Sequence, residues 1–73
     1  MITIGTKIRF RPSGWGEGQD YPGLKIPGKI VGTVTDVTKH LCVVEADYDG
    51  VKITECFGLY KGELRPHMAE VVR

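Results

Sequence analysis

The sequence predicts a small all-β domain, and two observations carry that prediction. Asp49-Gly50 separates two runs of strand-forming residues, 41–48 and 51–58. This dipeptide favours a two-residue hairpin turn, because both central residues of a type I′ turn need positive φ. Apolar and polar residues alternate on both sides of it, as in strands with one buried face. No segment keeps an apolar period of 3.6 residues, so we expect the 73 residues, 1–73, to form a single domain without a long helix.

The chain begins with a predicted strand that has a basic outer face. The residues expected on its buried face are Ile4, Ile8 and Phe10. Cationic residues alternate with them at Lys7, Arg9 and Arg11. Pro12 should end this strand, because proline cannot donate a hydrogen bond to a neighbouring strand.

A long loop is predicted next, over residues 12–28, which hold five Gly and three Pro. Loops of this length are uncommon in compact domains and often functional. This loop contains Trp15 and Tyr21. Two interpretations of Trp15 remain open: it folds back and fills an open end of the domain, or it forms part of a recognition surface.

The second strand is predicted over residues 28–37. Ile30 and Val34 share one face of it, whereas Val37 is out of phase with them. This change of phase indicates a β-bulge near Thr35-Asp36. Residues 38–40 should then form a short turn into the central hairpin.

The register of the central hairpin follows from placing its turn at Asp49-Gly50. The predicted pairs on the apolar face are Tyr48 with Val51, Ala46 with Ile53, Val44 with Glu55, and Cys42 with Phe57. In this register Cys42 and Cys56 point to opposite faces, so we expect two free thiols.

The C-terminal part should complete the sheet. Residues 59–66 are too short and glycine-broken for a helix, so we expect one turn of 3₁₀-helix there. Residues 69–72 include Ala69, Val71 and Val72, which should form a short last strand against the first one.

This layout resembles the SH3-like small β-barrel superfamily. The resemblance rests on Gly32-Thr33-Val34 in the second strand, on Glu63-Leu64-Arg65-Pro66, and on the order of strands and loops. It implies a five-stranded barrel with a long loop after the first strand and a 3₁₀ turn before the last. The chain is similar in length and layout to small barrels that serve as accessory subunits, and to KOW-type modules of nucleic-acid machinery. The Ala-Leu-Tyr-Asp-Tyr stretch of peptide-binding SH3 domains is missing, so no polyproline-binding residues carry over.

Little in the sequence indicates catalysis. His40 and His67 fall in a turn and in the tail, no Ser or Cys lies in a nucleophile motif, and the Cys and His spacing fits no zinc site. We therefore expect no enzyme activity, cofactor, metal or small-molecule substrate. The net charge of +1 also argues against a general polyanion binder.

Two functional hypotheses remain. The first is a protein-interaction, accessory or regulatory module that binds another protein or a second copy through Trp15, Tyr21 and Tyr60, since aromatic residues often anchor interfaces. The alternative is a nucleic-acid-binding barrel that uses Lys7, Arg9 and Arg11 for phosphate contacts.

The sequence also indicates where the protein acts. No apolar run approaches the roughly 18 residues that a membrane span needs, so we expect no membrane association. The N-terminus shows no signal-peptide pattern, and the cysteines are expected to be free. A cytoplasmic location is therefore expected.

Overall fold

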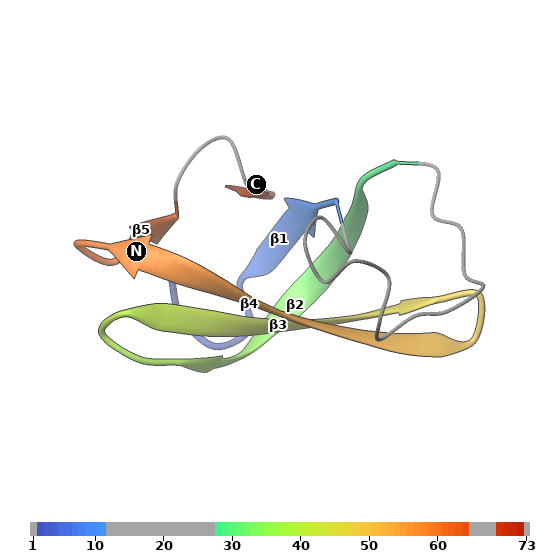
Figure 1. Ribbon diagram of the computed structural model, residues 1–73, viewed down its shortest axis with the longest axis horizontal. Helices are drawn as coiled ribbons and strands as arrows, with labels where there is room; N and C mark the ends of the chain where they lie inside the picture. The colour runs from blue at the N-terminus through green and yellow to red at the C-terminus, as the bar shows by residue number, and fades with distance from the viewer. Residues whose placement is uncertain (1, 12–27, 65–68, 73) are drawn as a thin grey trace.

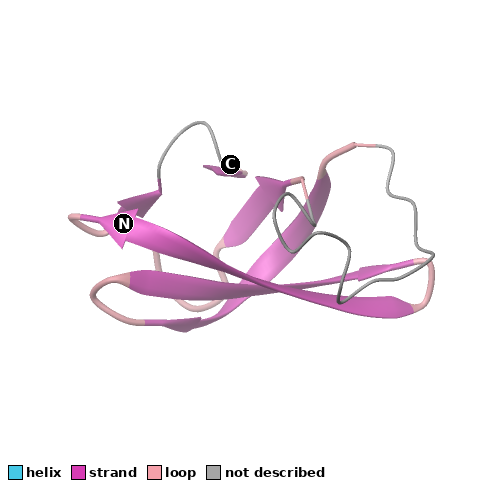
Figure 2. Cartoon of the chain, in the orientation of Figure 1, coloured by secondary structure: helices cyan, strands magenta, loops and turns pink. Residues whose placement is uncertain are grey.

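The computed structural model describes residues 2–11, 28–64 and 69–72 (Figure 1). These residues form strands and turns, and no helix is found among them (Figure 2). The strands are β1 (Lys7–Phe10), β2 (Ile30–Val37), β3 (Leu41–Tyr48), β4 (Val51–Tyr60), β5 (Glu63–Leu64) and β6 (Ala69–Val71). The all-β prediction is confirmed.

The strands form an antiparallel sheet with the order β5-β4-β3-β2-β1-β6, which curls into a small, nearly closed barrel. In Figure 1 the long β3–β4 hairpin runs along the molecule, and β1 and β2 lie across it. Strand β6 pairs with β1 through Ile8 opposite Val71 and Phe10 opposite Ala69. The predicted pairing of the last strand with the first is therefore confirmed.

The β3–β4 hairpin has the register that its turn predicts. Asp49 and Gly50 have φ values of 53° and 79°, as a type I′ turn requires. The observed pairs include Tyr48 with Val51, Ala46 with Ile53, Val44 with Glu55, and Cys42 with Phe57. Cys42 is buried, Cys56 is exposed, and both are free.

Strand β2 contains the predicted bulge, since its register against β3 shifts between Val34 and Asp36. It begins at Ile30 rather than at residue 28. Gly32 faces the interior of the barrel opposite Ile8 on β1, and β3 approaches it closely.

The core is formed by residues of the N-terminal segment, of β1 to β4 and of β6. Its fully buried side chains include Ile8, Phe10, Val34, Val44 and Ile53. The rings of Phe10 and Phe57 meet edge to face, with their centroids 5.4 Å apart. No polar or charged residue is buried among those that the structure describes.

One predicted core position was wrong. Ile4 is 66% exposed, whereas Ile2 is 4% exposed and joins the core. A turn precedes β1, in which the Thr6 N–H donates to the Thr3 carbonyl and Gly5 has a φ of 97°. Because this turn interrupts the extended chain, the alternation of β1 does not continue back to Ile4.

A 3₁₀ turn was predicted over residues 59–66. Residues 59–64 form a second hairpin instead. Strand β4 continues to Tyr60, and Lys61 and Gly62 then turn the chain with φ values of 53° and 81°. Tyr60 pairs with Glu63, so β5 adds a sixth strand that the sequence did not predict. Residues 65–66 lie outside the described part of the chain.

Candidate functional site

Tyr60 is the one predicted aromatic contact residue that the structure places. Its side chain is 63% exposed at the end of β4. The Nζ of Lys61 lies 5.4 Å from the centroid of its ring, within the range of a cation–π contact. Trp15 and Tyr21 lie outside the described residues, so their convergence with Tyr60 stays a prediction.

An open pocket of about 730 Å³ lies beside Tyr60 at one end of the barrel. We call it the end pocket. It lies between the turn at residues 38–40 and the turn at Lys61 and Gly62. Its described lining consists of Ile2, Val37, Thr38, Lys39, His40, Leu59, Tyr60, Lys61 and Gly62. The volume is in the range of pockets that hold small ligands or single side chains of a partner.

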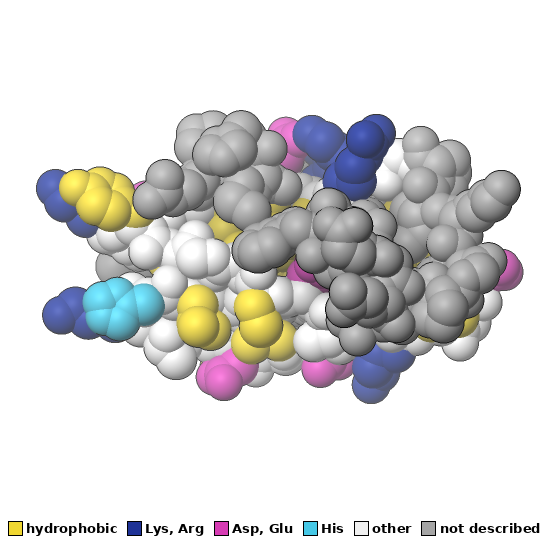
Figure 3. Space-filling model, in the orientation of Figure 1, with side chains coloured by type: hydrophobic (Ala, Val, Ile, Leu, Met, Phe, Trp, Pro, Cys, Tyr) yellow, Lys and Arg dark blue, Asp and Glu magenta, His cyan; other side chains and the backbone are white. Residues whose placement is uncertain are grey.

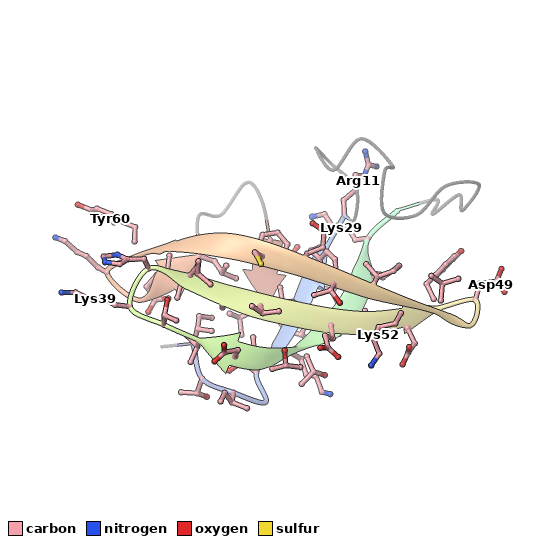
Figure 4. The ribbon with its side chains drawn as sticks, turned by 60° about the horizontal axis from the view of Figure 1, so that its bottom comes forward. Arg11, Lys29, Lys39, Asp49, Lys52 and Tyr60 are labelled. Carbon is pink, nitrogen blue, oxygen red and sulfur yellow. The ribbon has the colours of Figure 1, made fainter. Side chains whose placement is uncertain are left out.

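The end pocket combines an apolar floor with a cationic rim. Ile2 belongs to the core, and Val37 and Leu59 are partly buried against it. Lys39 and Lys61 are exposed and belong to different turns, and no acidic residue is found in the described lining. Figure 4 shows Lys39 and Tyr60 at the same end of the barrel, away from the Asp49 turn.

Side-chain and backbone hydrogen bonds fix the first turn of the end pocket and tie it to β4. In the first turn the Thr38 hydroxyl accepts the N–H groups of His40 and Leu41 at 3.3 and 3.2 Å. The Leu59 N–H then donates to the His40 carbonyl at 2.7 Å, which ties this turn to β4. These hydrogen bonds order the first turn against β4 before any ligand binds, which lowers the entropy cost of binding there.

The predicted basic residues Lys7, Arg9 and Arg11 are all on the surface, and we call them the β1 face. The alternation of β1 leaves Lys7, Arg9 and Arg11 exposed. Lys29 precedes the β2 residue that pairs with Phe10, and Figure 4 shows it and Arg11 in the same region of the barrel.

Some of these cations are engaged within the chain. Lys7 Nζ donates to the Thr33 hydroxyl at 2.7 Å. Glu70 on β6 lies 3.7 Å from Arg9 and 3.2 Å from Lys29, measured between charged atoms. Sequence reasoning missed Glu70, although the predicted pairing of the first and last strands was the signal that could have located it. The β1 face is therefore less positive than its lysines and arginines alone indicate.

Two features of the described residues bear on their reactivity, namely their metal-ligating side chains and the thiol of Cys42. No three His, Cys, Asp or Glu residues among them lie together as a metal-binding group. Burial raises the pKa of the Cys42 thiol, and the nearby charge of Cys56 raises it further, while a backbone hydrogen bond with Phe57 acts in the opposite direction. A buried thiol with a raised pKa is a poor nucleophile.

Charged side chains of both signs lie along the edges of the view in Figure 3. Lys and Arg side chains lie at its left end, at its top and at its lower right, and Asp and Glu side chains lie beside those at the top and lower right. Within the described residues, no helix is long and apolar enough to cross a membrane. Comparison of the chain with protein-family models, with curated proteins and with solved structures found no match.

Proposed function

We propose that this chain is a small, non-enzymatic protein-interaction or accessory module built on an SH3-like barrel. The strand order supports the fold assignment, because the last strand returns to β1 and a long segment joins β1 to β2, as in that superfamily. Strand β5 is then a short addition at the edge of the sheet.

The exposure of Tyr60 beside an apolar pocket carries the proposal. A tyrosine offers a large, rigid contact surface with a hydroxyl at its tip, and such residues often dominate the energy of an interface. Tyr60 is 63% exposed, and the floor of the pocket next to it is apolar. The partner is another protein or a second copy of this chain. Trp15 and Tyr21 belong to the same proposal as contacts from the 12–28 loop.

Affinity capture from native lysate tests this function. Tyr60→Ala should lose the captured protein while its melting temperature stays near that of the wild type, because the side chain is mostly in solvent. Val51→Ala is the matched control, since Val51 is 38% exposed at the other end of the same strand. Equal capture by the wild type and Tyr60→Ala would refute the role of this end of the barrel.

Nucleic-acid binding is the second candidate, and the cluster of cations on the β1 face favours it. Glu70→Gln should strengthen oligonucleotide binding, because it releases Arg9 and Lys29 from their ion pairs. Arg11→Gln should weaken binding. It should also reduce the slope of log affinity against log salt concentration by about one, as expected for the loss of one phosphate contact. Binding that responds to neither substitution would exclude this face.

A further inference from the structure

We infer that the end pocket binds an extended acidic peptide segment by taking up one large apolar side chain, with carboxylates on either side of it. The inference rests on the proposed protein-interaction function and specifies the chemistry of the partner. Three observations support it: the floor of the pocket, the positions of its cations, and the opposite charge at the far end of the barrel.

The floor of the pocket is suited to an apolar anchor. Ile2 is 4% exposed, and Val37 and Leu59 pack against the core, so the floor is part of the rigid barrel. A space of about 730 Å³ is larger than one aromatic side chain, so it also has room for the peptide backbone beside the anchor. The exposed ring of Tyr60 lies at the edge of this space and can pack against that backbone.

The cations favour acidic residues next to the anchor. Lys39 and Lys61 line the same pocket from two different turns, and neither forms an ion pair with a described residue. Lys61 is positioned by its contact with the Tyr60 ring. A peptide with one carboxylate before the anchor and one after it would place a negative charge near each lysine. Complementary charges of this kind raise specificity and the rate of association.

The far end of the barrel carries the opposite charge. Asp47 and Asp49 are exposed beside the β3–β4 turn, and Lys52 there lies 3.6 Å from Glu45. An acidic peptide is therefore repelled from that end and attracted to the end pocket. A nucleic-acid strand fits the pocket poorly, because single-strand sites combine a continuous basic groove with stacking platforms. The end pocket has two separated lysines around an apolar floor instead.

Chemical-shift mapping tests the inference directly. The ¹⁵N-labelled protein is titrated with capped hexapeptides of Asp and Glu that carry one central Phe, Leu or Trp, up to about 2 mM. We expect the shifts to centre on residues 37–40 and 59–62, which line the pocket. Peptides with a central Gly, or with Lys in place of the acids, should bind at least tenfold more weakly.

Lys61→Asn separates binding from folding. Lys61 has a φ of 53°, a conformation that asparagine adopts more readily than lysine, so the variant should be at least as stable as the wild type. Loss of the cation should weaken peptide binding roughly two- to fivefold, as for an exposed ion pair. Lys52→Asn, which removes the same charge at the far end, should leave binding unchanged. Lys39→Glu combined with Lys61→Glu should weaken it at least tenfold.

The outcomes distinguish this inference from the proposed function. No peptide binding, or binding equally sensitive to Lys52→Asn and Lys61→Asn, would overturn the inference. Shifts that centre on the β1 face, or that appear only with an oligonucleotide, would also overturn it. If capture of a protein requires Tyr60 but does not require Lys39 and Lys61, the proposed function is supported and the acidic-peptide inference is refuted.

Discussion

Gly32 is the position where the closest packing in the barrel can be tested. A Cβ atom at this position would lie 2.7 Å from the Glu45 carbonyl oxygen and 2.7 Å from Val44 Cγ1. Ordinary contacts begin near 3.4 Å, so strand β2 or β3 would have to move. Val44 is fully buried and β-branched, and the Glu45 carbonyl belongs to the backbone, so neither group can rotate away.

Gly32→Ala should therefore destabilise the protein by about 1–3 kcal/mol, the usual cost of overpacking a tight core. For a domain of this size that corresponds to a fall in melting temperature of roughly 4–24 °C. Circular dichroism during heating and urea titration measures both quantities. Replacing glycine also reduces the entropy of the unfolded chain, which stabilises by about 0.4–1 kcal/mol and partly offsets the loss.

Gly58→Ala is the matched control, because Gly58 lies in β4 with nothing within 4 Å of its added Cβ. It shares the unfolded-state effect without the clash, so the difference between the two variants isolates the steric cost. Adding Val44→Ala to Gly32→Ala should cost less than the sum of the single effects, since one clashing atom is then gone. A Gly32→Ala protein as stable as Gly58→Ala would refute the close approach of β2 and β3.

Two further predictions concern the cysteines. In the native protein a thiol reagent should label the exposed Cys56 quickly and the buried Cys42 only on unfolding, and equal rates would contradict the hairpin register. Burial raises the folded-state pKa of Cys42 above its value in the unfolded chain, so the folded state retains the proton to higher pH than the unfolded state does. Stability should therefore fall as pH rises from the thiol's unfolded-state pKa through its folded-state pKa. Cys42→Ala should lack this contribution to the fall, and a Cys42→Ala variant with the same pH profile as the wild type would contradict the prediction.

Local turn chemistry explains why the central part of the fold could be predicted. Asp49-Gly50 determines the turn type, and a side-chain period of two then determines which residues face the core. The bulge between Val34 and Asp36 could be predicted for the same reason, because it appears as a break in alternation. Each of these features depends on neighbours in the sequence.

The features that the sequence analysis predicted wrongly or missed depend on backbone conformations that the residue types alone do not predict. Ile4 alternates with Ile8 in the sequence, but the turn at Gly5 separates them. Lysine is uncommon at positive φ, so the hairpin at Lys61 and Gly62 gave a weaker signal than Asp-Gly. The end pocket depends on both this hairpin and the bond between Leu59 and His40, so it could not be predicted before the hairpin was known.

The distribution of charge in the barrel changes what the net charge of +1 implies about partners. Its longest dimension is 35 Å, whereas charges at physiological salt are screened over about 8 Å. A ligand at the end pocket therefore interacts with Lys39 and Lys61 and is largely screened from Asp47 and Asp49 at the other end. The near-neutral total conceals regions of opposite sign, so a net charge of +1 does not exclude polyanion binding at a single region. The residues that line a surface, rather than the total, determine which partner it can bind.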